Sequence, residues 1–172
     1  AMLGTLLLTV TGRARRIEAI VQDRTLALQR EITERERTEA ELRESEQRFR
    51  NILNNVPIGV VYTDLHGRIT LFNTGAERML GYSAAEVVDQ ITPAEISDPQ
   101  EVIARAAALS VELGTVITPG FEALAFKASR GIEDIYELTY IRKDGTRFPA
   151  IVSVTALRDD QEKVIGYLLI GT

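Results

Sequence analysis

The stretch from residue 59 to residue 82 constrains the fold of this chain most strongly, because it combines several local folding signals in a fixed order. It reads GVVYTDLHGRITLFNTGAERMLGY. Two runs rich in β-branched and aromatic residues, 60–63 and 69–72, enclose the turn sequence Asp-Leu-His-Gly at 64–67. Such runs on either side of a turn that contains Asp and Gly predict a β-hairpin.

A short helix is predicted directly after this hairpin. Asn73 stands at its start, where a side-chain oxygen can accept a free backbone N–H of the first turn, so Asn73 is predicted to be the helix cap. Ala76, Met79 and Leu80 share one face of this helix. Gly81 is predicted to end it.

Three further strands are predicted in the last part of the chain. They span residues 135–142, 147–157 and 164–170, and turn sequences at 143–146 and 159–162 separate them. The first of these turns contains the Asp-Gly signal of a tight hairpin. Together with the opening hairpin, the pattern predicts an α+β fold in which helices lie on one face of a five-stranded antiparallel sheet.

Helical signals fill most of the stretch between the second and third strands. Asp98-Pro99, a cap followed by a first-position proline, begins a helix that Gly114 ends. The segment 115–131 comes next and contains a hinge sequence, Pro119-Gly120. We interpret this segment either as a lid over a cavity or as an ordinary surface helix anchored by Phe121.

The order strand, Asp-x-x-Gly turn, strand, capping Asn and short helix ending in Gly-Tyr resembles the opening of a PAS domain. The resemblance covers about residues 51–172, and the domain itself is assigned to residues 55–172. It implies the PAS fold and a regulatory domain rather than an enzyme, with the catalytic output module beyond this chain. The run ITERERTEAELRESEQRFRNIL is similar to the linker helix that precedes PAS domains in bacterial membrane sensors. This implies a downstream output domain in the same polypeptide, a histidine kinase or a cyclic-dinucleotide enzyme.

Residues 13–54 are predicted to form one long helix, because they contain neither Pro nor Gly and are dense in Glu, Arg, Leu and Ala. Val21, Leu28, Leu42 and Phe49 fall on a seven-residue spacing, and Ile17 and Ile52 stand on the second seam position. The other members of that second position are polar: Arg24, Glu31, Thr38 and Ser45. A seven-residue repeat predicts a left-handed coiled coil, most simply a parallel homodimer. Arg35 interrupts the seam, so a solvated single helix with many Glu–Arg pairs stays open as the alternative.

Residues 1–12 are interpreted as an apolar stub, which Arg13, Arg15 and Arg16 follow. Its apolar run, 3–10, is too short to cross a bilayer, which takes about 20 residues. The stub is either the end of a membrane helix with the arginines on the cytoplasmic side or simply an apolar helix start. The first interpretation places the protein at the cytoplasmic side of the inner membrane, anchored by an upstream membrane helix.

The charge distribution argues against a nucleic-acid partner. The chain has 20 basic and 25 acidic residues and a net charge of −5, and the part from residue 51 onward has 10 basic against 16 acidic residues. A domain this acidic, without a basic stripe, does not attract a phosphate backbone.

Several cofactors lack the residues that would hold them. The chain has no Cys and no Trp, and its single histidine, His66, stands in the predicted turn rather than on the helix that usually supplies the haem ligand of PAS domains. Tyr140, Ala150 and Gly171 stand where flavin photoreceptors of the resembled family carry Asn, Asn and Gln. Haem, FMN-type photochemistry and a metal are therefore not expected, and the cofactor is left unknown. No catalytic motif is present either.

One face of the predicted sheet, with the helix above it, would enclose an apolar volume. Alternate residues of a strand share a face, which gives the following lining: Val61, Thr63, Leu138, Tyr140, Ala150, Val152, Val154, Tyr167 and Leu169, with Val102, Ala106 and Leu109 from the helix that starts at Asp98. Such a lining suits a small, mainly apolar ligand, and it suits a filled core equally well. Two functions stay open: a module that senses a small ligand or a conformational input and relays it to an output domain, and a ligand-free module for dimerisation and relay.

The other sheet face is also predicted to be apolar, with Val60, Tyr62, Ile151, Ile165, Leu168 and Ile170. A sheet that is apolar on both faces needs cover on both sides. The end of the long helix, residues 49–53, or a second protomer is expected to supply that cover, so the outer face is a second candidate for the homodimer contact.

Overall fold

The computed structural model describes the backbone of residues 2–172 and the side chains of Arg13 and residues 15–172. The apolar stub predicted at residues 1–12 lies outside the residues whose side chains are described. The chain divides into two compact units, residues 1–50 and 51–172. None of the helices among the described residues has an apolar stretch of membrane-spanning length.

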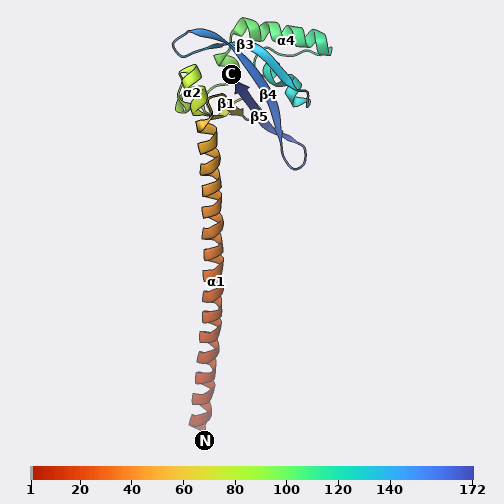
Figure 1. The fold of residues 1–172 in the computed structure, drawn as a ribbon. Helices are drawn as coiled ribbons and strands as arrows, with labels where there is room; N and C mark the ends of the chain where they lie inside the picture. Colours follow the sequence, from red (N-terminus) through yellow and green to blue (C-terminus); the bar gives the residue numbers. More distant parts are fainter. Residues whose placement is uncertain (1) are drawn as a thin grey trace. The chain divides into compact units, whose positions relative to one another are not determined.

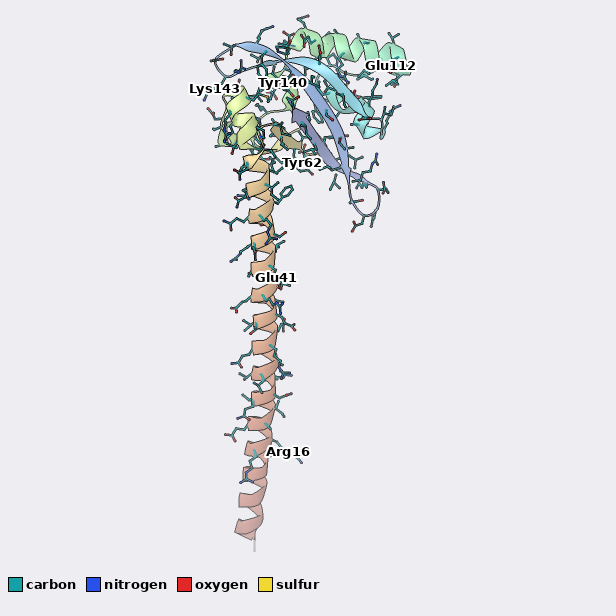
Figure 2. All side chains as sticks on the ribbon, in the orientation of Figure 1. Arg16, Glu41, Tyr62, Glu112, Tyr140 and Lys143 are labelled. Atoms are coloured by element: carbon teal, nitrogen blue, oxygen red, sulfur yellow. The ribbon has the colours of Figure 1, made fainter. Side chains whose placement is uncertain are left out.

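Helix α1 runs unbroken from Met2 to Asn55 (Figure 1), which confirms the predicted long helix. Its side chains from residue 15 to residue 50 are exposed, and Figure 2 shows Arg16 and Glu41 pointing away from the helix axis. Four Glu–Arg pairs at four-residue spacing follow its surface, with N–O distances of 2.6–3.6 Å. Each such pair stabilises an exposed helix by about 0.3–0.5 kcal/mol. These pairs help a long polar helix to form by itself.

A five-stranded antiparallel sheet, in the order β2-β1-β5-β4-β3, forms the second unit together with short helices, as predicted. Its strands are β1 (Gly59–Thr63), β2 (Ile69–Phe72), β3 (Asp134–Ile141), β4 (Arg147–Arg158) and β5 (Val164–Gly171). The first and last strands lie side by side, with Val61 opposite Leu169. The predicted Asp-Gly turn closes between β3 and β4, where Gly145 has a positive φ of 82°.

The helices of this unit lie between β2 and β3 in sequence: α2 (Thr74–Leu80), α3 (Ala84–Val87), the 3₁₀ helix η1 (Pro93–Ile96), α4 (Pro99–Leu113) and α5 (Phe121–Ser129). Helix α2 packs on β1, α3 on β2 and α5 on β4, whereas α4 packs mainly on α5. Both predicted caps of the longer helices form. Asn73 accepts the N–H of Ala76, and Asp98 accepts the N–H groups of Gln100 and Glu101.

Helix α5 forms within the segment 115–131 and corrects one expectation, about which helix covers the sheet. Its residues Ala123, Leu124, Ala125 and Ala128 are at most 3% exposed, so one face of α5 belongs to the core. It is also α5, and not the helix that starts at Asp98, that packs directly on the middle strands. The small alanine side chains allow this close approach to the sheet.

Candidate sensing site

The predicted pocket residues do come together in the structure. All twelve are buried, with exposures between 0% for Thr63 and 8% for Val61 and Tyr167. Val102, Ala106 and Leu109 belong to the same buried cluster as the strand residues, but α5 lies in the covering position that the sequence assigned to their helix. Their part in holding a ligand stays a prediction.

Buried side chains of the sheet and the helices form one apolar cluster between them. A small, partly open pocket of about 10 Å³ is lined by Gly59, Val61, Ala76, Met79, Leu80, Pro93, Ile96, Tyr140, Leu169 and Gly171. This volume admits about one water molecule. The Tyr140 ring, which lines this volume, packs edge-on against Phe148, with the ring centroids 5.9 Å apart. Burial raises the pKa of the Tyr140 hydroxyl, which therefore stays protonated.

Thr63 belongs to the predicted lining and has a buried side-chain hydroxyl without a hydrogen-bond partner among the described residues. Its exposed fraction is 0%. Leaving a buried hydroxyl unpaired costs about 1–3 kcal/mol. Its neighbour across the sheet is Tyr167, which is directly opposite in the β1–β5 pair.

Asn73 connects the end of α1, β1 and α2 through four hydrogen bonds. Its Oδ1 accepts the N–H groups of Val60 and Ala76, both at 2.8 Å, and its Nδ2 donates to the carbonyls of Leu53 at 2.8 Å and Ile58 at 3.0 Å. The residue is only 2% exposed. The sequence predicted the cap alone, because the other three partners depend on how the chain folds back on itself.

His66 lies where the sequence put it, in an exposed turn. Its backbone N–H donates to Asp64 Oδ1 at 2.8 Å, and the N–H of Arg68 donates to the same oxygen at 2.9 Å. The part of the chain that the structure describes contains no group of three or more His, Asp or Glu side chains placed to hold a metal ion. The sequence reasoning missed a groove beside this turn, along α5, since α5 was not predicted to be a core helix.

Comparisons with known proteins agree with this architecture. The family profile described as PAS fold matches residues 47–172. Sensor protein FixL of Bradyrhizobium diazoefficiens is 30% identical over 151 residues, which cover 88% of this chain and 26% of FixL. The chain therefore spans about a quarter of the length of that relative.

Solved structures show the same fold at low identity. The PAS domain of an HTR-like protein from Haloarcula marismortui is 21% identical, with a TM-score of 0.56, over 80% of this chain and 98% of that one. A PAS domain from Colwellia psychrerythraea is 22% identical, with a TM-score of 0.54, over 74% of this chain and 93% of that one. The family profile covers well over half of the chain and the solved structures share its fold, so the chain belongs to the PAS family.

Proposed function

We propose that this chain is the sensor module of a larger signalling protein, and that it relays a change in its PAS domain through a dimeric α1 coiled coil. The observation that carries the proposal is the row of exposed apolar side chains on α1. Ile17, Val21, Leu28, Leu42, Phe49 and Ile52 are each 57–62% exposed in the single chain. A seven-residue repeat of such residues is buried when two helices supercoil.

The seam of this coiled coil is interrupted by charge. Arg35 stands at a seam position, and its guanidinium pairs with Glu31 of the same helix at 3.4 Å. Polar seam residues reduce the stability of a coiled coil. A marginal dimer helix can change its packing for a small free-energy difference, which is what a signal carrier needs.

The output is proposed to be a separate domain in the same polypeptide, a histidine kinase or a cyclic-dinucleotide enzyme. The similarity to a protein named as a sensor over a quarter of its length supports a larger parent protein. We further propose that the module works on the cytoplasmic side of the inner membrane, anchored by an upstream membrane helix. The apolar run 3–10 followed by Arg13, Arg15 and Arg16 supports this placement.

Sedimentation tests the dimer seam. Leu28→Asp with Leu42→Asp places charge in the seam and should convert the dimer to a monomer, since each buried charge costs several kcal/mol. Gln29→Asp with Gln47→Asp adds the same charge outside the seam and should leave the dimer intact. If the Leu28→Asp, Leu42→Asp variant stays a dimer, the seam is refuted and the contact must lie on the outer sheet face.

This outer face still exposes three apolar side chains that a second protomer could cover. They are Ile135, Ile151 and Ile165, each 46–57% exposed, whereas Val60 of the predicted outer face is buried.

A ligand-free relay is the second candidate, because the interior cavity holds only about 10 Å³. Extraction and mass spectrometry of the purified protein, with an absorption spectrum, separate it from a sensor with an interior ligand. A clean, colourless sample favours the relay. A stoichiometric extracted compound favours a ligand-loaded interior.

A further inference from the structure

A surface groove runs beside α5, outside the enclosed core. Its volume is about 360 Å³, which lies within the range of small-molecule sites, roughly 300–1,000 Å³. Helix α5 and its end supply one wall, and the β1–β2 turn and the middle of β5 supply the other: Phe121, Glu122, Ala125, Phe126, Ser129 and Arg130, with Leu65, His66 and Tyr167. Ala125, Ser129 and Phe121 are four residues apart, so they follow one face of α5.

The walls of this groove carry three aromatic rings. The rings of Phe121 and Tyr167 meet edge to face, with their centroids 5.4 Å apart. Tyr167 is only 8% exposed and Ala125 only 3%, which makes them fixed parts of the groove wall. Burial also raises the pKa of the Tyr167 hydroxyl, so Tyr167 presents a neutral ring. Such a surface suits a flat, apolar body.

Arg130 gives the groove an available positive charge. Its guanidinium lies over the Phe126 ring, 4.3 Å from the centroid, and within the described residues it makes no ion pair. Arg105 and Arg147, by contrast, are each paired with an aspartate. A guanidinium that lies over a ring and lacks an acidic partner is suited to bind a carboxylate.

The acidic residue of the groove is already engaged. Glu122 accepts the Thr118 N–H at 3.0 Å, and its hydrogen bonds to Thr118 lower the pKa of this carboxyl. Glu122 also stands eight residues before Arg130, about 12 Å along a helix axis. It therefore leaves Arg130 free to pair with a ligand at the other end of the groove.

We propose that this groove binds a small aromatic carboxylate, with its ring against Phe121, Phe126 and Tyr167 and its carboxylate on Arg130. The proposal rests on the proposed sensor function and gives that function a ligand class outside the filled interior. The contacts also offer a route for the signal. A Cβ at Gly67 would stand 2.2 Å from Phe121 Cγ, so the α5 ring already lies against the turn between β1 and β2, and a ligand in the groove would contact both elements.

An NMR titration of the full chain, labelled with ¹⁵N, tests the site with phenylacetate and benzoate as probes. Acetate keeps the carboxylate without the ring, and benzyl alcohol keeps the ring without the charge, so both should bind much more weakly. We expect saturable shifts at Leu65, His66 and the amides of α5. Arg130→Gln should weaken phenylacetate binding by about tenfold or more, since a hydrogen bond to a charged group contributes about 1.5–3 kcal/mol.

Matched variants separate the groove from general charge effects. Arg130→Lys should keep part of the affinity, and Lys163→Gln, which removes a charge from the exposed β4–β5 turn, should change nothing. Leu65→Glu adds a carboxylate on the opposite wall at a residue that is 46% exposed, and it should weaken binding through repulsion. Equal affinity in Arg130→Gln, shifts confined to interior residues such as Leu138, or no saturable binding at millimolar probe would each overturn the proposal. Sedimentation of the same samples reports on the dimer seam separately, so failure of the groove is distinguishable from failure of the relay.

Discussion

The side chain of Asn73 joins the segments at the start of the PAS domain through hydrogen bonds. The sequence predicts a helix cap there, worth about 1 kcal/mol. The structure adds a second accepted N–H, from Val60, and two donated hydrogen bonds to Leu53 and Ile58. All of them end on one side chain that is 2% exposed, so its loss leaves several buried groups without partners.

Replacing Asn73 tests this count of partners. Asn73→Ala should lower the free energy of unfolding by roughly 2–4 kcal/mol, because it removes the cap and also leaves the buried Val60 N–H unpaired. Asn73→Asp keeps the acceptor but turns a carboxylate oxygen toward the Leu53 and Ile58 carbonyls in a buried site, so at pH 7 it should cost at least as much. Urea unfolding measures both, and Ser83→Ala serves for comparison because Ser83 is the exposed N-cap of α3. A loss near 1 kcal/mol for Asn73→Ala would mean that only the cap contributes.

Two turn glycines form a matched pair for a second prediction. Gly67 and Gly145 have positive φ angles of 84° and 82°, but a Cβ would meet Phe121 at Gly67 and nothing within 4 Å at Gly145. Gly145→Ala should cost about 1–2 kcal/mol, the backbone strain of this region. Gly67→Ala should cost about 1–3 kcal/mol more because of the overlap.

Denaturant unfolding of both variants checks the difference. Phe121→Ala in the Gly67→Ala background removes the ring that overlaps, so the two changes together should cost less than the sum of the single changes. Equal losses at Gly67 and Gly145 would show that the turn moves away from α5 without cost.

At the scale of elements, a buried ion pair joins α4, α5 and β3. Arg105 of α4 donates to both carboxylate oxygens of Asp134 at 2.7 and 2.8 Å and to the carbonyl of Ala123 at 3.0 Å. Its guanidinium lies 3.4 Å from the Tyr136 ring centroid. The side chains of Arg105 and Asp134 are 16% and 5% exposed. If one partner is removed, little water can therefore reach the charge of the other.

Breaking this pair should be costly. Asp134→Ala leaves a buried guanidinium unpaired and should lower the free energy of unfolding by about 3–5 kcal/mol. Arg105→Met with Asp134→Leu should cost less than Asp134→Ala alone, since neither charge then remains. The exposed pair Lys127–Glu112 also joins α4 and α5, and Glu112→Gln should cost less than about 1 kcal/mol. Similar losses for the two pairs in calorimetry would contradict the role of burial.

A second contact between elements should respond to pH. Hydrogen bonds from Lys143 of the β3–β4 turn and from Ser83 lower the pKa of the Glu86 carboxyl from 4.5 to about 2. A pKa that is lower in the folded state adds stability above the unfolded value of 4.5, and this stability is lost as the pH falls toward 2.

We expect the difference in the free energy of unfolding between the wild type and Glu86→Gln to depend on pH. The wild type should be more stable than Glu86→Gln at pH 7, and the difference should shrink below about pH 4.5 and vanish near pH 2. Chemical unfolding at several pH values measures it. Salt should reduce the gap, because both side chains are about half exposed. A gap that stays constant down to pH 2 would rule out the carboxyl as its source.

At the scale of the whole molecule, the end of α1 belongs to the PAS unit. The compact unit begins at Asn51, and Leu53 and Asn54 accept hydrogen bonds from Asn73 and the Thr74 N–H. A fragment of residues 51–172 should therefore fold with nearly the stability of the monomeric full chain, within about 0.5 kcal/mol. A fragment that starts at residue 59 loses these partners and should be about 1–3 kcal/mol less stable. Equal unfolding curves for the two fragments would mean that the folded PAS unit begins at residue 59 or later, and not at Asn51.

The sequence by itself determined the features that depend on neighbouring residues. The hairpin around residues 64–67, the caps at Asn73 and Asp98, and the unbroken α1 follow from local backbone preferences, which hold wherever the segment lies. Alternation along the strands also identified the nine strand residues of the predicted lining, all of them buried, because side chains of a strand alternate between its faces.

Tertiary structure alone decided what those elements enclose. Whether α4 or α5 covers the sheet depends on side chains that meet across distant segments, and in the fold it is α5 that packs on β4. The same packing left about 10 Å³ inside the core and about 360 Å³ beside α5. The partners of Arg105 and three of the four partners of Asn73 likewise come from other elements of the fold. No local rule contains such contacts, because they exist only after loops have closed and brought distant residues together.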